Sequence, residues 1–300
     1  MSTNNTFSFA RLALVMKRDF MENWKTNLYR FLGPYAIILL VMLVCSAHME
    51  NFREFSEIGL ATYCCVLFFG SVYSASQIME TMDTQQKRIS FLMLPATSLE
   101  KFVVRALYVT VGFVVMATLA LLLAEATRFL FLPLFDMPDT FHQSILSSVF
   151  SDMNFLADPS SITHSNTWPE EMTYSILLGQ ICSLLYTFWM HSFFILGGCY
   201  WHKHPFWKTL GSMILVHVLV LTVLGNVLVY ISKNNWEKYH ESLESIFGGV
   251  TINQSLTFWS IILLLFVVLN WWLSYRYFAR KQVVPVSRVN FLKNRKEATV

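Results

Sequence analysis

The chain has 300 residues, of which 55% are hydrophobic and only 14% are charged, and its formal net charge is +3. Soluble proteins contain about 45–50% apolar and about 25% charged residues, so this apolar surplus exceeds what a soluble core of the same length can bury. The composition excludes a disordered chain and a disulfide-rich secreted domain, and the small net charge argues against a nucleic-acid-binding protein.

The first predicted element is an amphipathic helix in the cytoplasmic tail, residues 1–30. Its apolar face would carry Phe9, Leu12, Ala13, Met16, Phe20 and Trp24, and its charged face Arg11, Arg18, Glu22 and Lys25. Such a helix is suited to lie in the lipid headgroup layer, although it could also pack against another cytosolic protein. We favour the interfacial position because the segment leads directly into an apolar run, with an expected turn at Gly33 and Pro34.

Six apolar runs are long enough to cross a bilayer, which takes roughly 20 helical residues. They cover residues 31–48, 58–79, 102–124, 174–200, 210–231 and 256–275. Each run is apolar around its whole circumference, unlike the one-sided stripe of a surface helix. The sequence therefore predicts an all-α integral membrane protein, with a six-helix transmembrane domain at 31–278 and a basic tail at 279–300.

Lysine and arginine are unequally divided between the two sides of these spans. If the N-terminus is cytoplasmic, 18 of the 22 basic residues fall on the inside and 4 on the outside. The inside segments are 1–30, 80–106, 201–209 and 276–300. The positive-inside rule therefore places both termini in the cytoplasm. The long external loop at 125–173 is acidic, which we interpret as a solvated face rather than a cation site.

The connection between the second and third spans carries the most informative pattern. Pro95 is expected to stop a helix that arrives from the N-terminal side, and Thr97 with Glu100 has the spacing of a capping box. The apolar residues left before Pro95 are Phe91, Leu92 and Leu94, and the basic residues beside them are Lys87, Arg88 and Lys101. An exposed apolar patch with a basic rim fits a docking site for another protein, and contact with lipid headgroups is the alternative.

Catalytic and cofactor-binding motifs are missing from the chain. It has no GxxxxGK[ST] loop for nucleotides, no HExxH and no GxSxG. Cys199, His202 and His204 could supply metal ligands, but an aromatic, basic turn at the membrane surface explains them without a metal. We therefore predict no catalytic residue, no resident cofactor and no metal site.

Polar groups are scarce within the predicted spans, and none of them is a carboxylate. Those that could line a pathway are Gln180, His191, His217 and Asn226. Ion-driven carriers usually place ionisable groups near the middle of the membrane, so this pattern argues against a secondary transporter. For His217 we expect a hydrogen bond between helices rather than a substrate contact.

Four stretches of the chain together resemble bacterial ABC-2-type transporter permeases. They are the amphipathic lead-in at 7–24, FLMLPATSLEKF at 91–102 with Arg105 after it, GGCYWHKHPFWKT at 197–209 and NWWLSYRYFARKQV at 270–283. The resemblance extends over essentially the whole chain, and the LPATSLEK segment is its most specific part. It implies the membrane-spanning subunit of an ATP-driven exporter in the bacterial cytoplasmic membrane.

The resemblance also implies partners. Residues 89–101 would sit in a groove of a separate ATP-binding subunit, which would hold ATP and magnesium. The coupling residues would be Phe91, Leu92, Leu94, Pro95, Thr97, Glu100 and Lys101. A second permease would complete a homodimer or a heterodimer. The residues alone leave a non-transporting membrane scaffold or sensor as the alternative, with an intramembrane enzyme as a third possibility.

Overall fold

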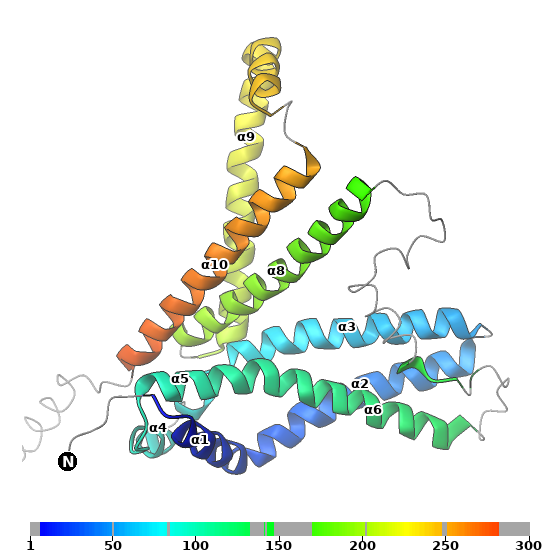
Figure 1. Ribbon diagram of the computed structural model, residues 1–300, viewed down its shortest axis with the longest axis vertical. Helices are drawn as coiled ribbons and strands as arrows, with labels where there is room; N and C mark the ends of the chain where they lie inside the picture. Colours follow the sequence, from blue (N-terminus) through cyan, green and yellow to red (C-terminus); the bar gives the residue numbers. More distant parts are fainter. Residues whose placement is uncertain are drawn as a thin grey trace, which may run out of the picture.

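The computed structural model describes residues 7–49, 51–82, 85–132, 141, 143–146, 170–201, 203–247 and 251–281. This part of the chain is almost entirely helical and contains no strand (Figure 1). The α-helices are α1 (Phe9–Glu22), α2 (Trp24–His48), α3 (Phe52–Ser76), α4 (Gln85–Leu92), α5 (Ser98–Leu107), α6 (Phe113–Phe131), α8 (Glu170–Tyr200), α9 (Pro205–Phe247) and α10 (Ile252–Lys281). A short 3₁₀-helix, η1 (Glu80–Met82), and one π-helical turn, η2 (Tyr108–Gly112), complete the described elements.

Six helical segments are long and apolar enough to span a membrane, which confirms the predicted spans. They are Trp24–His48, Phe52–Met82, Ser98–Phe131, Tyr174–Tyr200, Pro205–Val227 and Ile252–Arg280. Five of the six segments begin before the apolar run and three end after it, because polar and aromatic residues at the membrane surface continue the same backbone hydrogen bonds. The described chain is therefore that of a multi-pass, all-α membrane protein.

The expected turn at Gly33 and Pro34 is wrong, since both residues lie inside α2. The chain instead breaks at Asn23, between α1 and α2, where the backbone leaves helical geometry. The Asn23 side chain donates 2.9 Å to the Asp19 carboxylate and 3.0 Å to the Asp19 carbonyl. Asn favours such local bonds over helix continuation, whereas membrane helices tolerate a proline in their interior.

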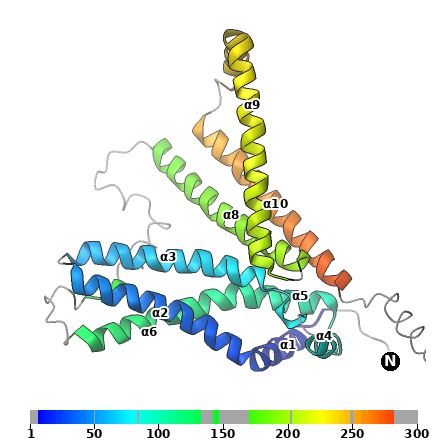
Figure 2. The same ribbon diagram turned by 180° about the vertical axis from the view of Figure 1, so that it is seen from behind.

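The helices converge at one end of the molecule and spread apart at the other. At the convergent end lie α1, α4 and α5, and we call it the α1 end (Figure 1). From it, α2, α3 and α6 run side by side as one group, while α8 and α10 form a separate pair. Viewed from behind, α9 leaves the others after its first turns and stands alone (Figure 2). The two groups of spans are therefore joined mainly at the α1 end.

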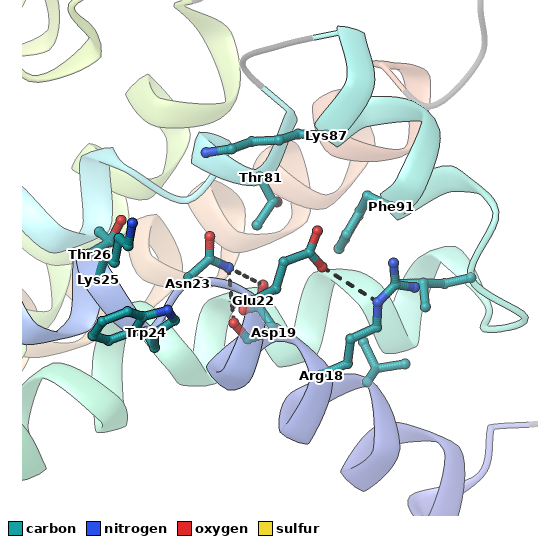
Figure 3. Close-up of a pocket in the computed structure, with 12 residues that line it drawn as sticks. Arg18, Asp19, Glu22, Asn23, Trp24, Lys25, Thr26, Thr81, Lys87 and Phe91 are labelled. Carbon is teal, nitrogen blue, oxygen red and sulfur yellow. Dashed lines mark hydrogen bonds and ion pairs between the residues drawn. The ribbon is translucent and has the colours of Figure 1, made fainter.

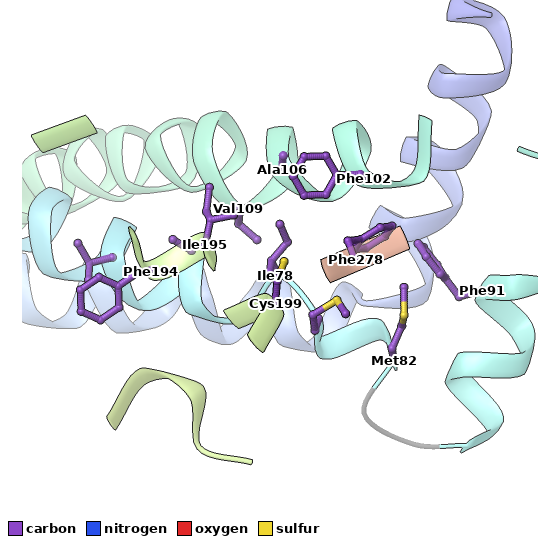
Figure 4. Packing of buried hydrophobic residues seen from close by; sticks show 13 residues of the cluster. Ile78, Met82, Phe91, Phe102, Ala106, Val109, Phe194, Ile195, Cys199 and Phe278 are labelled. Atoms are coloured by element: carbon purple, nitrogen blue, oxygen red, sulfur yellow. The ribbon is translucent and has the colours of Figure 1, made fainter. Parts of the chain in front are cut away.

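Two hydrophobic clusters hold these groups. The cluster at the α1 end joins α3, α5, α8 and α10 through residues that include Ile78, Phe102, Ile195 and Phe278 (Figure 4). The second cluster joins α2, α3 and α6 and is closed at the far end by Phe141 and Ile145. One cluster thus joins the two groups of helices, and the other joins the helices within the first group.

At the far end of the molecule, the expectation that a solvated acidic loop begins at residue 125 is wrong. Helix α6 continues to Phe131, and both Glu125 and Arg128 are buried in it. Glu125 accepts hydrogen bonds from the Ser144 hydroxyl (2.9 Å) and the Ile145 amide (2.6 Å). A short piece of the loop therefore folds back onto α6 because these charges need partners. Residues 147–169 of the predicted loop and 282–300 of the predicted tail lie outside the described residues.

Candidate functional site

The segment predicted to couple to a partner forms a helical hairpin at the α1 end. Helices α4 and α5 are its arms, and residues 93–97 make the turn between them. The capping box is confirmed: Thr97 Oγ1 accepts from the Glu100 amide (3.2 Å), and Glu100 Oε2 accepts from the Thr97 amide (2.8 Å). This pair of bonds satisfies two amide groups at the helix start and sets the direction in which α5 leaves the turn.

Two residues of the expected exposed patch point inward instead. Phe91 is buried and lies edge-on to Phe278 of α10, with 6.3 Å between ring centroids (Figure 4). Lys101, expected in the basic rim, is also buried, and its Nζ lies 5.7 Å from the Phe91 ring centroid. Leu94 is partly buried against the same cluster, and the side chain of Leu92 lies outside the described residues. The expected patch is wrong for Phe91 and Lys101 because α10 covers this side of the hairpin.

A different set of apolar side chains is exposed on the hairpin. Met93 is 80% exposed, Ile89 54% and Leu99 43%. Ile89 and Met93 are one helical turn apart and share a face, since the Met93 amide donates to the Ile89 carbonyl. Pro95, between Met93 and Leu99, is also exposed. We call Ile89, Met93 and Leu99 the hairpin patch, an exposed apolar surface of the α4–α5 hairpin.

Helix α1 is tied to the start of α5 through Glu100. This carboxylate is fully buried, and beyond its capping role its Oε1 accepts from the Ser8 amide (2.7 Å) and from Arg11 Nη2 (3.0 Å). Burying a carboxylate is costly unless it is paired and hydrogen-bonded, and Glu100 satisfies both conditions. The residue predicted as a coupling residue therefore also fixes the N-terminus of α1 to the hairpin.

A second, deeper ion pair joins α1 to α5. Arg105 Nη1 donates to Asp19 Oδ2 over 2.8 Å, and both side chains are buried. Arg105 also donates from Nε to the Ile78 carbonyl (3.0 Å) and from Nη2 to the Gln77 carbonyl (3.3 Å). These carbonyls belong to the end of the second span, so one guanidinium holds α1, the second span and the third span together.

Four further contacts complete this junction. Arg30 of α2 pairs with Glu80 of η1 over 2.6 Å, and the Tyr108 ring lies near the guanidinium groups of both Arg30 and Arg105, at 5.5 and 5.2 Å. Arg18 Nη2 donates to Ser90 Oγ on the other arm of the hairpin (2.6 Å). Helix α1 therefore contacts both arms of the hairpin, and apart from the exposed bond of Arg18 the polar contacts of this junction are buried or half-buried.

Sequence reasoning missed the pairing of Asp19, Arg30, Glu80 and Arg105. The signal in the sequence is weak: Asp19 follows Val15 by one helical turn, and these two are the buried residues of α1. An acid in register with a buried apolar residue indicates a buried partner, but it does not identify that partner. The apolar side chains of Phe9 and Phe20 on α1, and of Trp24 at the start of α2, are exposed, and the position of α1 in the headgroup layer stays a prediction.

A cavity of about 370 Å³ lies between α1 and α4 (Figure 3). Its lining includes Arg18, Glu22, Thr81, Lys87 and Phe91. Arg18 and Glu22 pair with each other across 3.4 Å. The Arg18 guanidinium and the Glu22 carboxylate on the α1 side of the cavity are thus paired with each other, and the α4 arm of the hairpin forms the opposite side of the cavity.

The four predicted pathway residues do not come together. His191 is buried in α8, where its Nε2 has no partner among the described residues, and the amide of Gln180 is likewise unpartnered. His217 is exposed on α9 and donates to its own helix at the Met213 carbonyl (2.8 Å), and Asn226 donates to the Thr222 carbonyl (2.8 Å). The expected interhelical bond of His217 is wrong within this chain, because α9 stands apart from the other spans.

Polar contacts that join two spans involve other residues, and one of them is buried between α8 and α10. Asn270 of α10 donates from Nδ2 to Ser192 Oγ of α8 over 3.0 Å, and both residues are buried. Among the described residues, no group of three or more His, Cys, Asp or Glu side chains is arranged to hold a metal. Cys199 lies in the cluster at the α1 end, and His202 lies outside the described residues.

No family model, curated protein or solved structure matches this chain.

Proposed function

We propose that the chain is the membrane subunit of an ATP-driven exporter of the ABC-2 type, located in the bacterial cytoplasmic membrane. The observation that carries this proposal is the hairpin patch, an exposed apolar surface on a hairpin that buried ion pairs anchor to the spans. The chain itself has no P-loop. A transport subunit of this kind needs a rigid docking element for an ATPase and no nucleotide site of its own.

The distribution of basic residues supports a cytoplasmic position for the hairpin. The α1 end carries the Lys- and Arg-rich segments, and the positive-inside rule assigns such segments to the cytoplasm, where ATP is available. Helix α1, with its exposed apolar face, would lie in the headgroup layer at the same level. The hairpin patch would then point away from the membrane, toward a cytoplasmic partner.

The connections of the hairpin support a mechanism of energy transfer. Helix α4 follows the second span through η1, and α5 is continuous with the third span through η2. In the proposed mechanism, movement of the ATPase pushes on Met93 and its neighbours. Because Arg105 binds Asp19 and the carbonyl groups of Gln77 and Ile78, the push would tilt α1 and both spans as one body.

The exposure of α9 supports a second permease subunit. None of the described side chains in the membrane-spanning window of α9 is buried in this chain, and both His217 and Asn226 are exposed. Polar side chains in a membrane usually face a protein surface or a water-filled pathway. A homodimer or heterodimer that covers α9 would provide this environment. Gln180 and His191 lie on α8 and would not be part of the surface that α9 offers to the second subunit.

The test is affinity purification of the tagged full-length chain from its native membranes, with mass spectrometry of what co-purifies. We expect a P-loop ATPase, and we expect Met93→Asp to remove it because the variant places a charge in the hairpin patch. Leu130→Asp is the matched control, since Leu130 is equally exposed (77%) but lies near the end of α6, away from the hairpin. It should leave the ATPase bound.

Two results would overturn the proposal. One is the absence of any P-loop ATPase from the wild-type sample, and the other is equal recovery of the ATPase with Met93→Asp and wild type. A co-purifying protein without a P-loop that is lost with Met93→Asp would favour the alternative, a membrane scaffold or sensor that recruits a cytoplasmic partner.

A further inference from the structure

An apolar groove of about 680 Å³ lies beneath α1, between this helix and the third span. On the α1 side it is lined by the helix face that includes Met16, Phe20 and Met21. The opposite wall runs along the third span from Leu107 to Met116. The groove is therefore bounded by an interfacial helix on one side and a membrane span on the other.

The length of the groove matches one leaflet of a bilayer. From Leu107 to Met116 the helix rises about 14 Å, at the usual rise of about 1.5 Å per residue. Half of a hydrocarbon core of about 30 Å is about 15 Å. A lipid acyl chain that enters at the level of α1 would thus lie along this wall through the depth of its own leaflet.

Two polar atoms at the groove have no hydrogen-bond partner among the described residues. Asn27 and Ser74 are both buried and both line the groove, and neither Asn27 Oδ1 nor Ser74 Oγ has a hydrogen-bond partner among the described residues. Buried polar atoms are normally satisfied, and those without a protein partner bind a water or a ligand. These two atoms indicate that the groove receives a polar group as well as an apolar chain.

Positive charge lies at the same groove. Lys17 is exposed on α1 and lines the groove, and Arg30 of α2 lines it as well. Glu80 neutralises Arg30 across 2.6 Å, so the charge available to a ligand is that of Lys17. An ammonium group on a flexible side chain at the membrane surface favours an anionic headgroup by about 1 kcal/mol.

The backbone is also irregular at this place. The π-helical turn η2, Tyr108–Gly112, forms part of the groove wall. Such turns are rare, and they occur frequently at functional sites. The side chain of Val111 in this turn is exposed toward the groove region, as is that of Val115 one turn later.

We infer that the groove is a binding site for one anionic phospholipid, with an acyl chain along Val111 and Val115 and the headgroup at Lys17. The lipid would cover the apolar face of α1, and its headgroup or an accompanying water would supply partners for Asn27 and Ser74. The site lies apart from the hairpin patch, so it does not depend on the proposed ATPase.

Native mass spectrometry of the detergent-purified full-length chain tests this site, with phosphatidylglycerol and phosphatidylcholine titrated separately. We expect one tightly retained phosphatidylglycerol and weaker retention of phosphatidylcholine. Lys17→Gln should lower the affinity for phosphatidylglycerol about fivefold, the equivalent of about 1 kcal/mol. Lys25→Gln is the matched control, because Lys25 is exposed at the start of α2 but does not line the groove, and it should change nothing.

A second pair of variants tests the acyl-chain site by filling it. Val111→Trp should prevent retention of the lipid, whereas Val114→Trp, on the same helix but outside the groove lining, should retain it. If Val111→Trp fails to fold, as judged by thermal unfolding, Val115→Trp replaces it. Equal affinities of Lys17→Gln and Lys25→Gln, equal binding of the two lipids, or full retention by the folded tryptophan variant would each overturn the proposal.

Discussion

The first three spans and the last three are held together by different forces. Buried charges lie at both ends of the first group: Asp19 pairs with Arg105 at the α1 end, and at the far end Arg128 and Glu125, which lie 3.7 Å apart within α6, bind backbone groups of residues 141, 143 and 145. In the last three spans the described polar side-chain contacts between helices are two neutral hydrogen bonds, from Asn270 to Ser192 and from Ser175 to Asn253, and the described residues of α9 are unburied through its membrane window.

This difference follows from the physics of helix association in lipid. Lipid tails are as apolar as leucine, so apolar contact alone gives little driving force between spans, and packing and polar contacts decide which helices associate. The first group has such contacts within one chain. The last group has few of them, so α9 depends on another protein or on lipid for its surroundings.

The largest effect should come from removing one member of the deepest ion pair. Asp19→Ala leaves the Arg105 guanidinium buried without its carboxylate, and breaking a buried pair in this way costs about 3–5 kcal/mol. SDS-induced unfolding in mixed micelles, followed by circular dichroism, measures the free energy of unfolding. Glu57→Ala is the control, because Glu57 and Arg53 form an exposed pair; its effect should stay within about 0.5 kcal/mol. Equal losses in the two variants would show that Asp19 does not hold α1.

A smaller effect is expected at the far end. Arg128→Leu removes donors to the Phe141 and Gln143 carbonyls, both at 2.9 Å, and leaves Glu125 with its two remaining donors. Because Glu125 keeps those bonds, we expect a loss of about 2–3 kcal/mol in the same unfolding measurement. Proteolysis should also become faster in the segment that contains residues 141–146. If Arg128→Leu lowered the free energy of unfolding more than Asp19→Ala does, the far end would contribute more to stability than the α1 end, contrary to this prediction.

Within the last three spans the corresponding variant should be milder. Asn270→Leu removes the bond to Ser192, and hydrogen bonds between membrane helices contribute about 0.6 kcal/mol on average, with a maximum of about 1.7. The unfolding measurement should therefore show a loss within that range. A loss comparable to that of Asp19→Ala would contradict the contrast between the two groups of spans.

The smallest effect on the isolated chain is expected on α9. His217 bonds only to its own helix among the described residues, so His217→Leu should change the free energy of unfolding of the monomer by less than about 0.5 kcal/mol. If a second permease subunit covers α9, the same variant should lower the dimeric fraction in analytical ultracentrifugation. A marked destabilisation of the monomer would mean instead that α9 packs within its own chain.

Prediction from the sequence succeeded where the cause is local. A span needs only a sufficient run of apolar residues, and all six were found. The capping box formed by Thr97 and Glu100 depends only on two residues that lie three positions apart. The side on which Phe91 lies depends on α10, more than 180 positions later in the chain, and its burial was not predicted. The sequence predicts the turn at Gly33 and Pro34 instead of at Asn23, because glycine and proline break a helix more readily in water than within a membrane.

The sequence by itself therefore determined the class of the protein, its six spans, the unequal distribution of basic charge and the start of α5. Only the tertiary structure decided which charges are buried and what they hold: Asp19 meets Arg105 across 86 positions, and Arg11 meets Glu100 across 89. Hydropathy and capping act between near neighbours, so they can be predicted from short stretches of residues. The pairing of buried charges depends on how whole helices pack, since each charge is stable only where distant backbone and side-chain groups complete its hydrogen bonds.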